Sequence, residues 1–156
     1  MISEFRDQYY FLSNFYETPV TWNGITYQNN EAAFQSGKVA TQKERAEFAN
    51  LNPSEAKRKG RRVKLVENWE EIKNQVMYEV CLAKFTQHPE LMDALLDTED
   101  ELLVEGNTWG DQIWGVSKGK GENRLGKILM LIRQMERSKR GYRQIQDIKQ
   151  ELGLKL

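Results

Sequence analysis

The sequence predicts a single, mainly α-helical domain with a small β-hairpin near its N-terminus. The chain has 156 residues, which suits one domain with a sizeable core. Apolar side chains recur at helical spacing over residues 69–85 and again over residues 125–135. Asn23 and Gly24 form a strong two-residue turn signal between residues that favour strands. No internal repeat or linker divides the sequence, so we expect the helices and the hairpin to share one core.

Charge, cysteine and histidine counts narrow the classes of protein. Lys and Arg number 23, and Asp and Glu also number 23, so the formal net charge is zero. This balance argues against steering of the whole protein toward nucleic acid but allows a local basic patch. The one cysteine, Cys81, lies in an apolar helical run, which favours a buried thiol over a nucleophile. With only one histidine besides, we expect no zinc site.

The same counts bear on the cellular compartment. No apolar run reaches membrane-spanning length, and the N-terminus lacks the apolar core of a signal peptide. A single thiol cannot form an internal disulfide, which fits a reducing environment. We therefore expect a cytoplasmic protein without a membrane partner.

Residues 1–27 are dense in aromatic and turn-forming side chains. Residues 9–16 are predicted as a strand or an irregular segment, and residues 19–27 as the hairpin. Ser13 and Asn14 stand between aromatic residues, where they could contact a base or a sugar. The alternative is a buried aromatic cluster with a local side-chain turn.

A helix is predicted from about Glu31 to residue 41 or further, with Asn29 or Asn30 as its N-cap. Glu31, Gln35 and Lys38 are spaced i, i+4 and i+7 and share one face of this helix. Such a face could supply a base, an orienting amide and a cation or nucleophile to a hydrolytic site. The alternative is a solvated polar face whose first-turn carboxylate pairs with the helix dipole.

Residues 42–50 are predicted to continue as helix, and Asn52 or Ser54 to begin the next short helix. The one dense basic run, residues 57–64, lies at the end of that helix, with Gly60 as its stop. It is either a solvated helix end or a cradle for phosphates, and the sequence leaves both open.

The clearest helix begins after Asn68, which we expect to cap it in a capping box with Glu71. It ends at His88, a residue better placed to be a cap than a catalytic base, and Pro89 begins the next helix. Residues 102–105 follow as a short strand or extended segment.

Residues 106–121 form a predicted loop with an acid, two tryptophans, several glycines and two lysines, a composition typical of loops that hold ligands. After the loop, Asn123 is expected to cap a helix and to present free N–H groups to phosphate. Gly141 is expected to interrupt this helix. The remaining residues then form a final amphipathic helix, packed on the body or on a partner.

Short motifs occur in a distinctive order over roughly residues 8–136. They are Phe11-Leu12-Ser13-Asn14-Phe15, Glu31 with Gln35 and Lys38, Ala56 with Gly60-Arg61, Asn68-Trp69, Lys84-Phe85, Leu103-Val104-Glu105, Asp111 with Trp114-Gly115, and residues 119–126 leading into Leu129-Met130. In this order and spacing the chain resembles the NADAR family, also called YbiA-like.

The resemblance implies a mainly helical NADAR (YbiA-like) domain, and we expect residues 1–156 to form this single domain. Residues 137–156 lie outside the resemblance, and their own periodicity predicts a C-terminal helical extension. The resemblance also implies an N-glycosidase without a cofactor that breaks the C1–N bond of a ribose phosphate. The main hypothesis is removal of ADP-ribose from the amino group of guanine in nucleic acid, opposing an ADP-ribosyltransferase toxin. The alternative substrates are phosphoribosyl-amino intermediates of riboflavin synthesis.

The resemblance also assigns candidate residues. The catalytic candidates are Glu31, Lys38 and Asp111, and the candidates for substrate binding are Ser13, Asn14, Phe15, Gln35, Arg61, Trp69, Trp114, Gly115, Asn123 and Arg124. One position departs from the family, which usually has histidine directly after the Glu of the first helix, where this chain has Ala32. This departure removes the family's histidine from the proton-transfer route and keeps a non-catalytic module for ADP-ribose or NAD as an alternative. A helical protein-interaction domain is a further alternative, but it does not explain the composition of the loop of residues 106–121.

Overall fold

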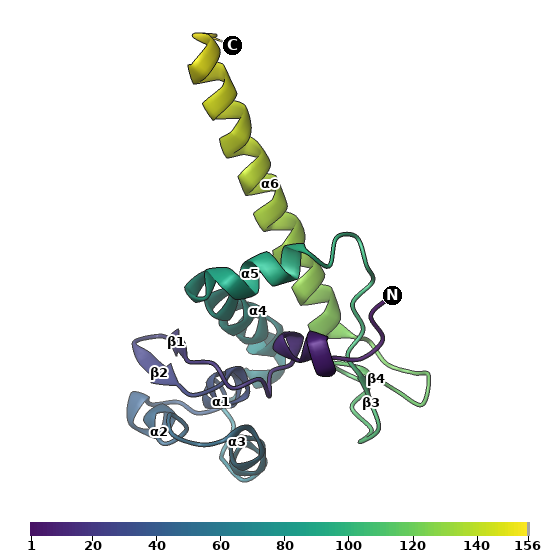
Figure 1. Cartoon of the computed structure of the whole chain (residues 1–156). Helices are drawn as coiled ribbons and strands as arrows, with labels where there is room; N and C mark the ends of the chain where they lie inside the picture. Colours follow the sequence, from purple (N-terminus) through teal and green to yellow (C-terminus); the bar gives the residue numbers. More distant parts are fainter. Residues whose placement is uncertain (156) are drawn as a thin grey trace.

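In the computed structural model, which describes residues 1–155, helix α4 (Trp69–Gln87) lies at the centre of the fold. It packs against α1, α5, α6 and strand β1 (Figure 1). Its buried residues include Trp69, Val76, Val80 and Phe85, so the stripe predicted from the sequence is the face that enters the core. Asn68 occupies the N-cap, but its side chain makes no capping bond, and the predicted capping box is therefore wrong.

The N-terminal hairpin has the predicted turn. Strands β1 (Val20–Trp22) and β2 (Ile25–Tyr27) pair antiparallel, with Trp22 opposite Ile25. Asn23 and Gly24 both have positive φ, 50° and 82°, as a two-residue hairpin turn requires. The preceding aromatic segment is irregular, with a 3₁₀ helix η1 (Asp7–Leu12) followed by turns.

Helix α1 (Asn30–Ser36) is short and completely buried. Asn29 caps it by accepting a hydrogen bond from the N–H of Ala32, as predicted. The predicted continuation through residue 50 is wrong, because Thr41 starts a separate helix α2 (Gln42–Ala46) by accepting a bond from the N–H of Glu44. A β-extended cap residue cannot continue the preceding helix, so the chain turns between α1 and α2.

Helix α3 (Pro53–Gly60) begins with a capping box between Asn52 and Glu55 and packs against α1. Helix α5 (Pro89–Leu96) begins at Pro89, as predicted. His88 is its N-cap residue, and its Nε2 lies 2.6 Å from the carbonyl oxygen of Pro19 and 3.1 Å from the hydroxyl of Thr18. The histidine therefore joins α5 to the hairpin segment.

The predicted loop contains a small ladder. Strands β3 (Gly106–Asn107) and β4 (Val116–Ser117) pair in parallel, and Leu103 makes a parallel bridge with Ile2 just before them. The N-terminus and the loop therefore lie side by side, next to the start of α6 (Figure 1).

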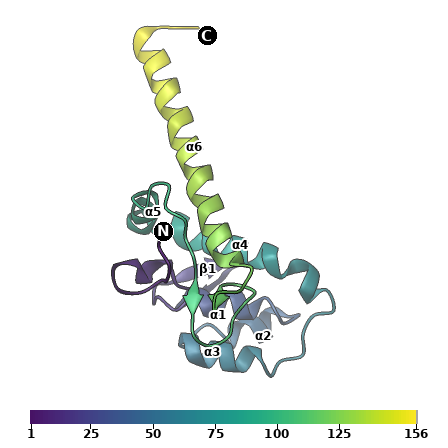
Figure 2. The ribbon, with the colours of Figure 1, turned by 90° about the vertical axis from the view of Figure 1, so that its right-hand side faces the viewer.

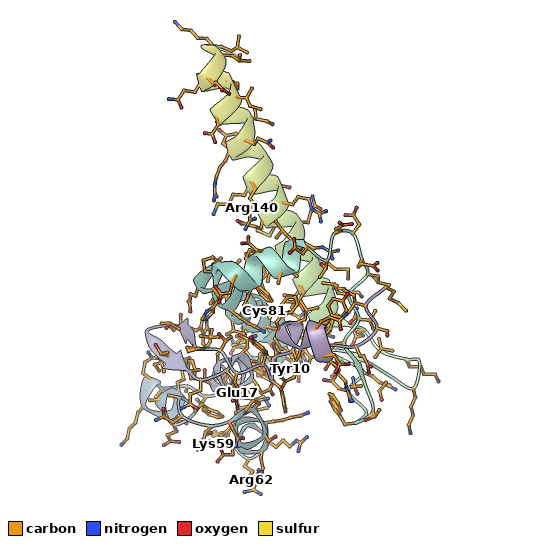
Figure 3. The ribbon with its side chains drawn as sticks, viewed as in Figure 1. Tyr10, Glu17, Lys59, Arg62, Cys81 and Arg140 are labelled. Carbon is orange, nitrogen blue, oxygen red and sulfur yellow. The ribbon has the colours of Figure 1, made fainter. Side chains whose placement is uncertain are left out.

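Helix α6 (Arg124–Leu152) starts against the body through Leu125, Leu129 and Ile132 and then projects away from it (Figures 1 and 2). The predicted interruption at Gly141 is wrong, since the helix runs through this residue. Beyond Arg140, labelled where α6 leaves the body in Figure 3, the large apolar side chains are exposed rather than packed on the body: Tyr142, Ile145, Ile148 and Leu152. Leu156, the last residue of the predicted extension, lies outside the described residues.

The helices can also be compared with what a membrane span requires. Within residues 1–155, none combines the length and the apolar character needed to cross a bilayer.

Candidate active site

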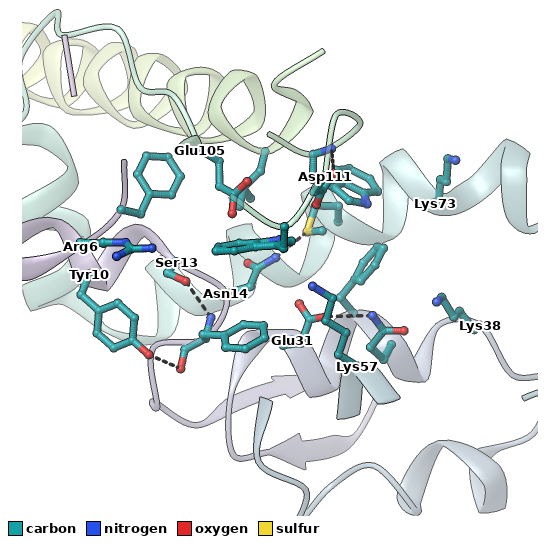
Figure 4. A pocket seen from close by; sticks show the side chains of 18 of the residues that line it. Arg6, Tyr10, Ser13, Asn14, Glu31, Lys38, Lys57, Lys73, Glu105 and Asp111 are labelled. Atoms are coloured by element: carbon teal, nitrogen blue, oxygen red, sulfur yellow. Dashed lines mark hydrogen bonds between the residues drawn. The ribbon is translucent and has the colours of Figure 1, made fainter. Parts of the chain in front are cut away.

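A pocket of about 430 Å³ opens beside α1, at the centre of the fold. Helices α1, α3 and α4, the segment after η1 and the loop around β3 all contribute to its wall (Figure 4). Its lining residues are Phe5, Arg6, Tyr10, Ser13, Asn14, Phe15, Glu31, Phe34, Gln35, Lys38, Lys57, Trp69, Lys73, Met77, Glu105, Trp109, Asp111, Trp114 and Leu125. The polar face predicted for α1 therefore points into a pocket rather than into open solvent.

Glu31 is a buried carboxyl group held by its neighbour one turn later. Gln35 Nε2 donates a hydrogen bond of 2.8 Å to Glu31 Oε1. Burial raises the pKa of Glu31 above its ordinary value, and the bond from Gln35 and the charges of Lys57 and Lys38 oppose this rise only in part. A carboxyl group with a raised pKa keeps its proton to a higher pH than an exposed one and can deliver that proton to a substrate.

Lys38 follows the end of α1 and lies half-buried in the wall of the same pocket. Its Nζ donates a 3.3 Å hydrogen bond to the carbonyl oxygen of Gly60 and lies 5.9 Å from the centroid of the Trp69 ring. Burial lowers the pKa of Lys38; the charge of Glu31 opposes this change, and the charges of Arg61 and Lys73 add to it. A larger neutral fraction of the amine makes it a better nucleophile.

Glu105 brings a second carboxyl group into the pocket that was not among the predicted site residues. Burial, followed by the charge of Asp111, raises the pKa of Glu105 to about 7. Asn107 Nδ2 lies 3.2 Å from its Oε2, and a Cβ at position 115 would overlap with the same oxygen. Gly115, predicted to bind substrate, does not line the pocket but leaves room for Glu105.

Asp111 shapes the loop that carries it. Its Oδ1 accepts hydrogen bonds from the N–H groups of Ile113 (3.0 Å) and Trp114 (2.9 Å), and its own N–H donates to Asn107 Oδ1. The carboxylate also lines the pocket, where its charge raises the pKa of both Glu31 and Glu105. Its chemical role in the predicted reaction remains a prediction.

A buried lysine fixes the segment that contains Ser13, Asn14 and Phe15. Lys84 Nζ donates hydrogen bonds to the carbonyl oxygens of Phe11 (2.6 Å) and Ser13 (3.0 Å). Burial lowers the pKa of Lys84 to about 8. The Asn14 side chain is itself committed to the core, since its Oδ1 accepts a 2.7 Å bond from Asn30.

Aromatic rings form much of the remaining wall. The Phe34 ring lies 5.4 Å from the Trp69 ring and 5.2 Å from the Trp114 ring, between centroids. Such clusters offer apolar faces that a base or a sugar can contact. The predicted site residues Trp69 and Trp114 thus belong to one packed group with a ring of α1.

Three further predicted binding residues lie outside the pocket lining. Arg61 is an exposed residue at the C-cap of α3 and reaches the site only through its effect on the pKa of Lys38. Arg124 donates to Asn74 and Glu122 in a separate groove between α4 and α6. Asn123 is buried, accepts from the N–H of Glu105 and donates to the carbonyl oxygen of Leu103.

Three N–H groups at the start of α6 are already paired. The N–H groups of Asn123, Arg124 and Leu125 donate to the carbonyl oxygens of Gly115, Ile113 and Trp114, respectively. The preceding loop therefore takes three of the donors that the phosphate site predicted at this helix terminus would need.

Lys57, Glu105 and Trp109 are the pocket residues of clearest chemical interest that the sequence reasoning missed. Lys57 stood in the basic run, Glu105 in a motif of the resemblance, and Trp109 in the glycine-rich loop, so each belonged to a noticed segment. In residues 1–155, no cluster of three or more His, Cys, Asp or Glu side chains has the arrangement of a metal site.

Fold and pocket together define a small, mainly α-helical domain whose pocket combines buried carboxyl groups, lysines and aromatic faces. The chain belongs to the NADAR domain family, whose model matches residues 2–136. The predicted family and fold class are thus confirmed.

Individual relatives agree with this assignment. The chain is 43% identical over 132 residues to the N-glycosidase YbiA of Escherichia coli (strain K12), and the match covers 82% of each chain. The NMR structure of the E. coli protein YbiA superposes with a TM-score of 0.79 at 39% identity, covering 90% of this chain and 87% of that one. A riboflavin biosynthesis protein of Vibrio vulnificus (strain YJ016) is 34% identical over 132 residues, which cover 80% of this chain but 35% of that protein.

Proposed function

We propose that this protein is an N-glycosidase that removes ADP-ribose from the amino group of guanine in nucleic acid. The observation that carries the proposal is the buried Glu31 carboxyl group, with its raised pKa, in one pocket with Lys38 and Glu105. Figure 4 displays Glu31 and Glu105 extending from different segments toward the same space. Relatives named N-glycosidase support the reaction class.

Breaking the C1–N bond requires a proton on the leaving nitrogen and water at C1. Protonated Glu31 donates to the nitrogen as the bond electrons move onto it, and the positive charge that develops at C1 is stabilised by nearby carboxylate charge, for which Asp111 is the candidate. Water then adds to C1 and returns a proton to Glu31. The released products are guanine in nucleic acid and free ADP-ribose.

Lys38 provides a second route through the same pocket. Its neutral amine can add to C1 of the ring-opened sugar and expel the guanine amino group, which forms a Schiff base. Water hydrolyses the Schiff base and restores the amine. In the first route Lys38 has a different task, to hold a phosphate or orient the sugar.

Ala32 does not interrupt either route. Its side chain is fully buried and is not among the lining residues, so the position of the family histidine faces the core in this chain. The proton transfers are therefore assigned to carboxyl groups that do line the pocket.

The second candidate function is hydrolysis of phosphoribosyl-amino intermediates of riboflavin synthesis, which breaks the same kind of bond. The named function of the Vibrio vulnificus relative favours it. For the first function, the basic residues 57–64 are the candidate contact with nucleic acid, and the expected partner is an ADP-ribosyltransferase toxin acting in the cytoplasm. A non-catalytic module for ADP-ribose or NAD is the remaining alternative.

The test is release of ADP-ribose from a DNA oligonucleotide that carries ADP-ribosylated guanine. Wild type should release it, and Glu31→Gln should lose about 10²–10⁴-fold in rate while remaining folded. Glu151→Gln, an exposed change on α6, is the matched control. If folded wild type releases no ADP-ribose, this substrate is rejected, and the same assay is run on phosphoribosyl-amino compounds. If the protein binds either kind of compound without turning it over, the binding module is supported. Full activity of Glu31→Gln would reject the assignment of Glu31.

A further inference from the structure

The ammonium group of one lysine lies over two aromatic rings of the pocket. Lys57 Nζ lies over the Phe15 ring, 5.8 Å from its centroid, and over the Trp109 ring, 5.5 Å from its centroid. The three residues come from separate segments, since Phe15 follows η1, Lys57 lies on α3 and Trp109 lies between β3 and β4. All three line the pocket, and Trp109 is 55% exposed. Two ring faces therefore meet a common, accessible space that holds a positive charge.

The ammonium group of Lys57 is not fixed there by an ion pair. Within the described chain, residues 1–155, no carboxylate oxygen lies within 4.0 Å of Lys57 Nζ. The lysine acts on Glu31 and Glu105 at longer range, where its charge opposes the rise in their pKa. A flexible side chain held by ring faces and distant charges can be displaced by a ligand.

We propose that Phe15 and Trp109 form a stacking slot for the nucleobase that leaves in the reaction, and that the slot favours a positively charged base. This inference rests on the proposed function: the proton from Glu31 reaches the leaving nitrogen ahead of cleavage, so the base carries positive charge until the electrons of the C1–N bond neutralise it. Aromatic faces attract cations, and flat bases stack on them. In the absence of a base, Lys57 occupies the slot.

The slot explains why aromatic and acidic residues share one wall of the pocket. A neutral base gains stacking alone, whereas a base that becomes protonated also gains attraction to both rings and to the nearby carboxylates. The attraction is therefore greatest while the base holds the transferred proton and the C1–N bond is still breaking, which is the condition for accelerating the reaction rather than merely binding the substrate.

The experiment compares binding of guanosine with binding of 7-methylguanosine, a purine nucleoside with a fixed positive charge on its ring. Titration calorimetry at pH 6 on the full chain should give a preference of roughly tenfold for the methylated nucleoside. Trp109→Leu and Phe15→Leu should each remove most of this preference, and Trp109→Phe should retain it. Lys57→Met should increase affinity for 7-methylguanosine, because the competing cation is gone.

Tyr142→Leu is the matched control, since Tyr142 is an exposed aromatic residue on the projecting part of α6. It should leave both affinities unchanged. Equal affinity of wild type for the two nucleosides would overturn the slot. A preference that survives both Leu variants would also overturn it, because the carboxylates alone would then account for the selectivity.

Turnover of ADP-ribosylated guanine, measured on the same preparations, separates this inference from the proposed function. Hydrolysis without the binding preference would overturn the slot and leave the proposed function standing. The preference with its loss in the Leu variants, but without hydrolysis, would support the slot and reject the proposed substrate.

Discussion

Gln35 donates its side-chain N–H to Glu31 one helical turn earlier, at 2.8 Å, and both residues are buried. The amide oxygen of Gln35 has no hydrogen-bond partner within the described part of the chain. The amide is thus committed to the carboxyl group through its donor side. This contact controls how readily Glu31 takes up a proton, because it stabilises the ionised form.

Replacing Gln35 with Met should shift the pH dependence of the reaction, because Gln35 affects the pKa of Glu31. Without the hydrogen bond, the pKa of Glu31 rises further above its ordinary value, so the limb of the pH–rate profile that reports this group moves to higher pH. The profile of kcat against pH measures the shift. A profile that loses height without moving would show that Gln35 contributes to packing alone.

Glu105→Gln should make the protein more stable at neutral pH. The folded state raises the pKa of Glu105 from 4.5 to about 7, so it binds more protons than the unfolded state between these values. Stability from this group is therefore lost as pH rises through that window. The variant has no carboxyl group to ionise at this position. Its free energy of unfolding should therefore exceed that of wild type by up to about 3 kcal/mol above pH 7.

Urea unfolding of both proteins at pH 5 and pH 8 measures this difference in the free energy of unfolding. The gap should widen between the two pH values, and Glu151→Gln should show no such widening. A constant gap would mean that the Glu105 carboxyl titrates alike in the folded and unfolded chain.

The contribution of Lys84 to the free energy of unfolding should become more favourable as pH rises. Its folded pKa of about 8 is below the ordinary 10.5, so the unfolded state binds more protons between these values. Below pH 8 the buried lysine is charged and destabilises the folded state by the full amount. As pH rises toward 10.5 this penalty disappears, and the free energy of unfolding increases by about 3 kcal/mol.

The comparison uses Lys84→Met, in a Cys81→Ala background because the buried thiol beside it titrates in the same range. Relative to Lys84→Met, the parent protein should gain stability from pH 7.5 to pH 10. Parallel pH profiles of the two proteins would contradict the buried, charged state of Lys84 at neutral pH.

Borohydride reduction during turnover tests the covalent route. If Lys38 forms a Schiff base, mass spectrometry should find a reduced sugar adduct on this residue, and Lys38→Ala should lose both adduct and activity. Lys73→Ala is the control, since Lys73 also lines the pocket. No adduct, together with an active Lys38→Ala variant, would leave only the route through Glu31 and water.

Local signals in the sequence predicted the parts of the fold that depend on neighbouring residues. The Asn23-Gly24 turn, the Asn29 cap and the helix start at Pro89 each follow from a few adjacent side chains. The face of Glu31, Gln35 and Lys38 followed from helix spacing, and all three residues line the pocket.

Residues whose meaning depends on distant segments could not be predicted in this way. Lys57 is one cation in a basic run, and only the fold places its ammonium group over both Phe15 and Trp109. Asn123 has the sequence of an N-cap, but its φ of 52° and its bonds to residues 103 and 105 give it a different task. Gly141 did not interrupt α6, since one glycine costs an exposed helix only about 1 kcal/mol.

Helix α6 consists of two parts that differ in what supports them. Arg140, through its ion pair with Asp93, is the last residue of the described helix whose side chain bonds to the body. The turns beyond it are held by backbone hydrogen bonds alone, and a lone helical segment of that length is marginal in water. Amide protons of residues 142–152 should therefore exchange with solvent by local fraying, while those of Leu129 and Ile132 exchange only when the core opens. In a hydrogen-exchange experiment, one uninterrupted helix should thus show two different free energies of opening, one for local fraying and one for opening of the core.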